Sequence, residues 1–113
     1  MFFIKRSIID TIGLFDEDNF PKGYGEENDY SMRAKLNGFL NVVTLDTYIF
    51  HHEHASFKEG SKMLMERGIQ MINTMYPSYS TEINVFRTNP TFNNFKTHVN
   101  KKIGDTKVCQ QNL

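Results

Sequence analysis

Two glycines that stand directly before a cluster of carboxylates constrain this chain more than any other feature. Gly23 and Gly25 flank a tyrosine, and Glu26 and Glu27 follow at once. The glycines end a loop that begins near residue 14 and holds too many turn-forming residues for regular structure. Acidic residues favour the first turn of a helix because they complement its dipole. The pattern therefore predicts a loop at a surface or a site, followed by a helix from Glu26 or Glu27 to Asn37.

Apolar runs and helical spacings predict alternating strands and helices in the rest of the chain. The expected elements are strands over residues 1–4 and 39–44, an apolar run over 47–50, and helices over 7–12, 26–37 and from about residue 57 until Pro77. Ser7 is placed to cap the first helix and Gly13 to end it. This alternation indicates the α/β class in one small domain. Residues 78–113, rich in asparagine, threonine and lysine, are expected to form a weakly structured tail.

Charge and cysteine content bound the setting in which the chain works. Thirteen basic and thirteen acidic side chains cancel without forming long blocks, which gives no electrostatic case for nucleic acid as a partner. Cys109 is the single cysteine and cannot close an intrachain disulfide. The apolar N-terminal run of residues 1–4 is too short for a membrane span or a secretory signal. These features indicate a cytoplasmic protein.

The carboxylates after Gly25 are candidates for acid–base chemistry. Glycines let the backbone approach a substrate closely, and crowded carboxylates repel one another, so that one of them can accept a proton from an attacking hydroxyl. A purely structural role is the alternative. Acidic residues are common at helix starts, and Asp29 with Arg33 has the spacing of an ordinary helical ion pair.

Two further clusters contain residues that ligate metals. His51, His52 and His54 follow an apolar run, and a neutral imidazole binds Mn²⁺ or Zn²⁺ readily, although solvated histidines at a strand end are equally consistent with the pattern. A small histidine-based metal protein is the corresponding minor hypothesis. The run from Asp16 to Asp18 looks like the Asp-X-Asp pattern beside a nucleotide diphosphate. It lies in a turn-rich loop and not after a long apolar strand, so ordinary acidic turn residues are the preferred interpretation.

Three separated motifs, taken in order, resemble the C-terminal portion of family 2 glycosyltransferases. They are Ile12–Glu17, then Gly23–Tyr30 with Met32–Ala34 and Gly38-Phe39, then Tyr48–His51 with Ser56-Phe57. The resemblance covers about residues 1–77 and is specific because all three motifs recur with matching order and spacing. It implies an α/β fold of the GT-A type, of which this chain would hold the catalytic acceptor side and lack the N-terminal nucleotide-binding half.

The resemblance also implies an inverting transfer from a nucleotide-sugar donor to a saccharide acceptor. By position, the general base falls on Glu27, with Glu26 as its neighbour or alternative, and His51 falls on a ligand of a divalent cation, Mn²⁺ or Mg²⁺. The acceptor-binding residues would be Tyr24, Gly25, Asp29 and Arg33. Apart from the resemblance, a noncatalytic saccharide-binding module would use aromatic rings to stack on sugars, and the candidates are Phe20, Tyr24, Tyr30 and Phe57.

The missing donor half leaves room for several partners. Association with a donor-binding chain, self-association through exposed strand edges, and proximity to a membrane are each compatible with the sequence. A noncatalytic module that binds saccharides or a protein partner through the acceptor surface is the alternative function.

Overall fold

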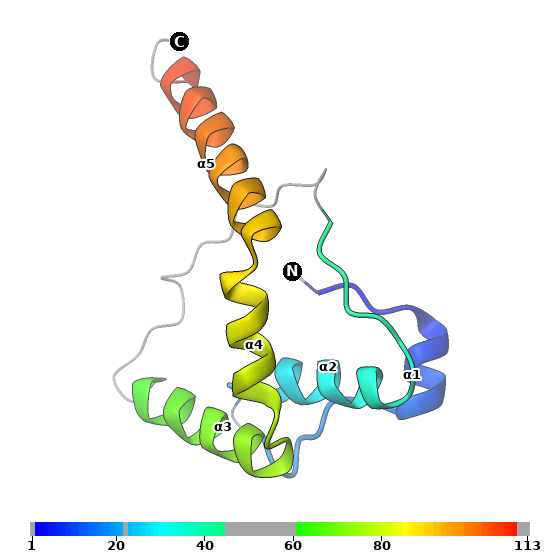
Figure 1. Ribbon diagram of the computed structural model, residues 1–113. Helices are drawn as coiled ribbons and strands as arrows, with labels where there is room; N and C mark the ends of the chain where they lie inside the picture. The colour runs from blue at the N-terminus through cyan, green and yellow to red at the C-terminus, as the bar shows by residue number, and fades with distance from the viewer. Residues whose placement is uncertain (1, 22, 45–60, 111–113) are drawn as a thin grey trace. The chain divides into compact units, whose positions relative to one another are not determined.

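The computed structural model describes residues 2–21, 23–44 and 61–110 (Figure 1). In these ranges the chain is helical, and the helices are α1 (Arg6–Ile12), α2 (Glu26–Leu36), α3 (Ser61–Met75), α4 (Tyr79–Thr88) and α5 (Pro90–Gln110). The chain divides into two compact units, Met1–Tyr79 and Ser80–Leu113. Each unit is described by itself.

The predicted α/β fold, and with it the partial GT-A-like sheet, is wrong for the residues that the structure describes. These residues contain no strand, and their β-type pairing is limited to one isolated bridge between Pro21 and Gly23. A strand exists only through backbone pairing with a neighbouring strand. In the predicted strands over residues 1–4 and 39–44, residues 2–4 and 40–44 make no backbone hydrogen bond to another described residue, and the N–H of Phe39 donates to the carbonyl of Ala34 in α2 (3.0 Å). The apolar run over residues 47–50 lies outside the described residues.

Helix α1 confirms the first helix predicted from the sequence but not its cap. The helix begins one residue earlier than expected, with Lys5 at the N-cap and no side-chain hydrogen bond there, so the prediction that Ser7 caps it is wrong. Gly13 ends the helix as predicted. Its φ of 78° lies in the left-handed region that glycine tolerates, and its N–H donates to the carbonyl of Ile9.

Helix α2 confirms the helix predicted after the two glycines. Gly25 stands at its N-cap, acidic residues occupy its first turn, and Asn37 stands at its C-cap. Its buried positions are Asp29, Tyr30, Met32 and Ala34. The helix therefore presents one face to the interior and leaves Glu27 of its first turn exposed to solvent.

Helix α3 packs against the start of α2 through a glycine. Ile72 is completely buried, as expected from its place on the apolar face, and the helix ends before Pro77. Gly68 is also buried, and a Cβ atom built there would lie 1.6 Å from the carbonyl oxygen of Tyr24. Only glycine allows this approach, so Gly68 has a packing role that its poor helix propensity alone does not suggest.

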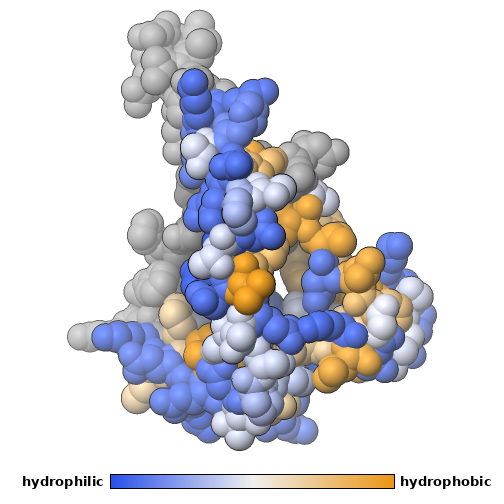
Figure 2. Space-filling view, in the orientation of Figure 1, coloured by the Kyte–Doolittle hydropathy of each residue, from blue (hydrophilic) through white to orange (hydrophobic). Residues whose placement is uncertain are grey.

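The core of the first unit is small. Its buried side chains are Phe20, Tyr30, Met32, Ala34, Ile72 and the charged Asp29. Many large apolar side chains remain outside it; Phe3 is 80% exposed and Leu40 is 86% exposed. Figure 2 shows apolar surface where α1 and the segment after α2 lie in Figure 1.

The apolar segments 2–4 and 40–44 line a cleft of about 440 Å³ on this unit. Tyr30 forms part of its wall, and the hydroxyl of Tyr30 is buried without a hydrogen-bond partner among the described residues. The rings of Phe2 and Tyr30 meet edge to face with centroids 6.3 Å apart. The described residues that were expected to form strands thus line an apolar cleft.

The second unit is helical where the sequence predicted a weakly structured tail. Asn89 separates α4 from α5, and its side-chain oxygen accepts hydrogen bonds from the N–H groups of Thr91 (2.9 Å) and Phe92 (3.2 Å). Asparagine before a helix whose first residue is proline is a standard start signal. The rings of Phe86 and Phe92 lie 4.4 Å apart across this junction.

Over the described part of the chain, no helix is both long enough and apolar enough to span a membrane.

Candidate functional site

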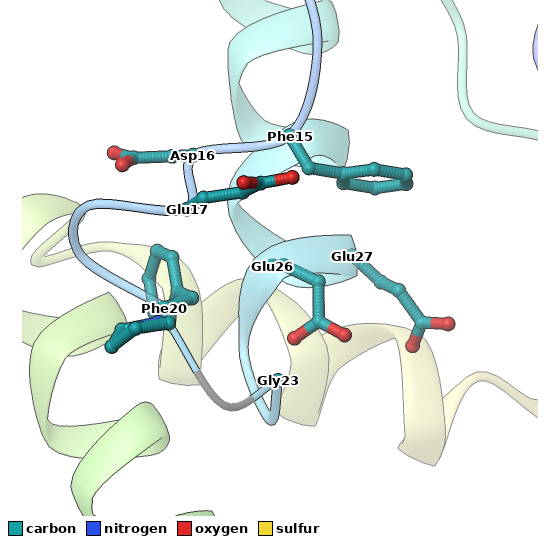
Figure 3. Close-up of a pocket in the computed structure, with 8 residues that line it drawn as sticks. Phe15, Asp16, Glu17, Phe20, Gly23, Glu26 and Glu27 are labelled. Atoms are coloured by element: carbon teal, nitrogen blue, oxygen red, sulfur yellow. The ribbon is translucent and has the colours of Figure 1, made fainter.

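A pocket of about 580 Å³ opens between the loop before α2 and the first turn of α2. Four carboxylate side chains and two aromatic rings belong to its wall. The residues that line it are Phe15, Asp16, Glu17, Phe20, Pro21, Gly23, Glu26 and Glu27 (Figure 3). The pocket thus contains both candidate base residues of the sequence analysis.

Backbone conformations that favour glycine bring the loop and the helix together. Gly25 has a φ of 137°, and a Cβ atom there would lie 2.6 Å from the ring of Phe20. The buried Phe20 ring therefore packs directly under the helix start, where a side chain at position 25 would displace it. Tyr24 also has a positive φ, 63°, which is uncommon for a residue other than glycine. The close packing of Gly68 against the Tyr24 carbonyl supports this uncommon backbone conformation of Tyr24.

The two glutamates at the start of α2 have different surroundings. Glu27 is exposed, whereas the Oε2 atom of Glu26 is buried and has no hydrogen-bond partner among the described residues. The Glu26 carboxylate lies near Gly23, because a Cβ atom built on Gly23 would be 3.3 Å from Glu26 Oε1. Figure 3 shows the Glu27 side chain on the same side of the helix as the ring of Phe15. Glu27 is thus open to an incoming molecule, and Glu26 has a free acceptor oxygen at the pocket.

The loop supplies the opposite wall. Figure 3 shows Phe15 and Glu17 reaching to one side of the loop, and the carboxylate of Asp16 turning to the other. Asp16 accepts hydrogen bonds from the backbone N–H of Asn19 (3.0 Å) and from its side-chain amide (2.7 Å). The amide of Asn19 is the main reason that the pKa of Asp16 lies below its ordinary value. Asp16 therefore stabilises the turn as an ionised carboxylate, while Glu17 remains exposed.

A hydrogen-bonded network behind the pocket fixes the orientation of α2. Asp29 is completely buried and accepts hydrogen bonds from Arg33 Nε (2.7 Å) and from the hydroxyl of Tyr76 (2.6 Å). Arg33 also donates to the carbonyls of Ile12 (2.8 Å) and Leu14 (2.9 Å). Burial, and then the hydrogen bond to Asp29, raise the pKa of Tyr76 to about 12. One guanidinium thus joins α2 to the end of α1 and to the start of the pocket loop.

The structure separates the predicted site residues into two groups. Glu26 and Glu27 line the pocket, whereas Tyr24, Gly25, Asp29 and Arg33 support it from behind or below and do not belong to its described wall. Of the aromatic residues proposed for sugar stacking, Phe20 contributes to the wall, while Tyr30 is buried in the apolar cleft. Phe57 and the metal-ligand candidate His51 lie outside the described residues.

The sequence predicts that this loop lies at a surface or a site, but it does not single out Phe15 and Glu17 as residues of the wall. Both residues belong to the motif Ile12–Glu17, and the acidic run from Asp16 to Asp18 has the pattern of ordinary turn residues. That interpretation fits the contacts of Asp16 with Asn19. One sequence signal could have indicated the shared pocket. Phe15 is followed at once by Asp16 and Glu17, and the same loop leads to a second cluster of carboxylates at Glu26 and Glu27.

The described residues do not form a metal centre. Within the described ranges, no group of three or more histidine, cysteine, aspartate or glutamate side chains is arranged to hold a metal ion. The carboxylates of the pocket therefore do not fit a multidentate cation site in this arrangement, and no step of a reaction is assigned to a metal at these residues.

Comparison with known proteins relates part of the chain to an enzyme of sugar transfer. Over 75 residues the chain is 35% identical to a galactofuranosyl glycosyltransferase of Leishmania donovani. The match covers 66% of this chain but 17% of that protein, so the chain corresponds to a small part of its relative. No protein-family model and no solved structure matches the chain. The relationship supports a role in glycosyl transfer in general terms.

Proposed function

We propose that this chain forms the acceptor side of an inverting glycosyltransferase that transfers a sugar from a nucleotide-activated donor to a saccharide. The observation that carries the proposal is the pocket in which Glu26 and Glu27 face Phe15 and Glu17. Carboxylates bind sugar hydroxyls through charge-assisted hydrogen bonds, and aromatic rings cover the apolar face of a sugar ring. The partial relationship to a glycosyltransferase supports the same assignment.

In the proposed reaction, Glu27 is the general base. Its exposed carboxylate takes the proton from an acceptor hydroxyl, and the oxygen attacks the anomeric carbon of the donor as that proton leaves. The bond from the anomeric carbon to the nucleotide diphosphate breaks on the opposite side, and the electron pair leaves with the diphosphate. Attack from the opposite face inverts the anomeric configuration.

Glu26 has a supporting role in this proposal. Its buried, unpartnered Oε2 atom can accept a hydrogen bond from a second acceptor hydroxyl and so orient the reacting one. Glu26 is also the alternative base, because its carboxylate lines the same pocket as that of Glu27.

The other residues of the predicted acceptor set act through position. Asp29 and Arg33 hold α2 and the pocket loop in register, and Tyr24 with Gly25 places the helix start over Phe20. We assign them to the acceptor site as supports of Glu26 and Glu27. A shift of about 1 Å in such supports is enough to reduce catalysis strongly.

The donor side rests on the resemblance and on the name of the relative. The proposal includes a galactofuranosyl donor and a donor-binding polypeptide that completes the enzyme. It also includes a divalent cation (Mn²⁺ or Mg²⁺) with His51 as a ligand. A cytoplasmic setting, self-association and proximity to a membrane are further parts of it.

A transfer assay tests the proposed function. The purified chain, together with the donor-binding polypeptide that completes the enzyme, is incubated with nucleotide-activated galactofuranose, Mn²⁺ and a neutral disaccharide, and the product is followed by mass spectrometry. Glu27→Gln should abolish transfer, whereas Glu66→Gln, which changes an exposed carboxylate of α3 outside the pocket, should leave it unchanged. Equal turnover of the Glu27→Gln variant and the wild type would reject the base assignment.

A noncatalytic saccharide-binding module is the second candidate. It is favoured by the same wall of aromatic rings and carboxylates, which binds a saccharide without any need for a donor. Calorimetric titration with UDP, GDP and dTDP, each with and without Mn²⁺, separates the two. Metal-dependent nucleotide binding that His51→Ala removes supports the transferase. Saccharide binding with no transfer even beside the donor-binding polypeptide supports the module.

A further inference from the structure

The pocket wall carries a strong excess of negative charge. Asp16, Glu17, Glu26 and Glu27 contribute four carboxylates, and the described residues of the wall include no basic side chain. Lys22 lies outside the described residues between two residues of the wall, and one ammonium group there would still leave a net charge of minus three (four carboxylates against one lysine). The pocket is therefore unfavourable for anions.

Arg33 acts on the pocket only from outside its wall. The hydrogen bonds from Asn19 are the main cause that holds the pKa of Asp16 below its ordinary value, and the charge of Arg33 is the smallest of the lowering causes. Arg33 directs its guanidinium to Asp29 and to the carbonyls of Ile12 and Leu14. The guanidinium nitrogens of Arg33 thus donate to partners behind the pocket, and Arg33 does not belong to the described wall. An anionic group in the pocket would thus be repelled by four carboxylates, and the described wall offers it no basic side chain to bind.

We infer that this pocket selects an uncharged saccharide acceptor and excludes phosphorylated and carboxylated sugars, and that Glu17 is a specificity-determining residue. The inference rests on the proposed function, because it assumes that a saccharide occupies the pocket. Hydroxyl groups of a neutral sugar donate to Glu17, Glu26 and Glu27, whereas a phosphate or carboxylate offers no hydrogen to donate when ionised. Each carboxylate within about 5 Å of an anion lowers its affinity roughly fourfold or more.

Glu17 suits this role because it faces the α2 carboxylates and has no structural duty of its own. Its side chain is exposed, and Figure 3 shows it on the side of the loop that carries Phe15, opposite Asp16. Asp16 is held in the turn by Asn19, so its substitution would disturb the loop as well as the charge. Changing Glu17 alters the charge of the pocket with little effect on folding.

Titrations of the full chain with three matched probes test the inference. The probes are methyl galactoside, the corresponding uronic acid, and the phosphate monoester of its primary hydroxyl, and binding is followed through amide shifts in nitrogen-15 NMR spectra. We expect the neutral probe to bind and each anionic probe to bind at least about tenfold more weakly at low salt. The difference should narrow as ionic strength rises, because salt screens the carboxylates.

Charge variants locate the effect. Glu17→Lys should strengthen binding of the anionic probes about tenfold or more, and Glu17→Gln should give an intermediate gain. Glu66→Lys makes the same change of net charge on α3 and should leave the ratio of neutral to anionic affinity unchanged. Equal gains in the Glu17 and Glu66 variants would overturn the role of Glu17.

The outcomes separate this inference from the proposed function. Binding of the neutral and anionic probes with equal affinity at the pocket overturns the charge selection but retains a saccharide site. Binding of none of the three overturns the saccharide pocket itself, and the selectivity falls with it. Preferential binding of the neutral probe, reversed by Glu17→Lys, supports both.

Discussion

The hydroxyl of Tyr76 donates a 2.6 Å hydrogen bond to the buried carboxylate of Asp29 and so joins the end of α3 to α2 across 47 positions of sequence. Asp29 lies in the first turn of the helix that carries Glu26 and Glu27. The charge of Asp29 is compensated by Arg33 on its other oxygen. The pocket carboxylates therefore project from a helix whose orientation depends on a buried ion pair and one tyrosine hydroxyl.

Replacing Tyr76 by phenylalanine should destabilise the first unit. The substitution leaves one oxygen of the buried Asp29 carboxylate without its partner, which should lower the free energy of unfolding by about 1–3 kcal/mol. Urea denaturation followed by circular dichroism measures the change. Thr74→Ala, which removes an exposed hydroxyl of α3, should change it by less than about 0.5 kcal/mol. Similar small effects of both substitutions would show that the Tyr76 hydrogen bond adds nothing to stability.

The burial of Tyr76, together with its hydrogen bond to Asp29, should make stability fall at alkaline pH. Since the pKa of Tyr76 is about 12 in the folded chain, against 10.0 ordinarily, the folded state holds the proton more tightly than the unfolded state. The resulting stabilisation is complete below pH 10.0 and is lost as the pH rises toward about 12. Unfolding free energies measured across this window should decrease more steeply for the wild type than for Tyr76→Phe. Parallel curves would contradict the assignment.

The sign of the change in unfolding free energy on Gly68→Ala should show whether packing or helix propensity dominates at this position. Alanine favours a helix by about 1 kcal/mol over glycine, so propensity alone predicts a stabilised chain. The new Cβ atom would lie 1.6 Å from the carbonyl oxygen of Tyr24, so we expect instead a loss of about 1–3 kcal/mol or more. Thermal denaturation measures the sign, and Gln70→Ala at an exposed position of α3 is the control. A stabilised Gly68→Ala variant would show that α3 does not approach Tyr24 closely.

Arg33→Lys should loosen the pocket loop although it keeps the charge. An ammonium group cannot reproduce the three directed hydrogen bonds to Asp29, Ile12 and Leu14, so the cost should be about 1–3 kcal/mol. Hydrogen exchange should accelerate at the amides around residues 12–17. Arg6→Lys alters an exposed ion pair and should cost less than about 0.5 kcal/mol. Unchanged exchange in Arg33→Lys would contradict the role of the guanidinium.

Local signals in the sequence predicted α1, α2 and α3 better than they predicted the fold class, whereas α4 and α5 were not predicted. The acidic start of α2, Gly13 as the end of α1, and the apolar face of α3 are short-range features that the chain carries wherever it folds. The segments 2–4 and 40–44 have the composition of strands, but a strand also needs a partner for its backbone. The described chain provides none, and composition cannot supply that information.

The candidate site was predicted in part for the same reason. Glu26 and Glu27 are adjacent in sequence, so their clustering was visible at once. The contribution of Phe15 and Glu17 depends on how the loop folds back to α2, and the links of Arg33 to Ile12 and Leu14 involve backbone carbonyls, which every residue has. No residue pattern marks a carbonyl as a partner, and these contacts emerge only in three dimensions.

The attachment of α1 through Arg33 has a consequence for motion. No residue of α1 is buried, yet the carbonyls on both sides of Gly13 are held by one guanidinium from α2. Breaking those two bonds would free the N-terminal helix and slacken the loop that carries Phe15 and Glu17, while the core around Ile72 stays closed. The N-terminal helix and the near wall of the pocket should therefore open together as one cooperative substructure, at a lower free energy than global unfolding.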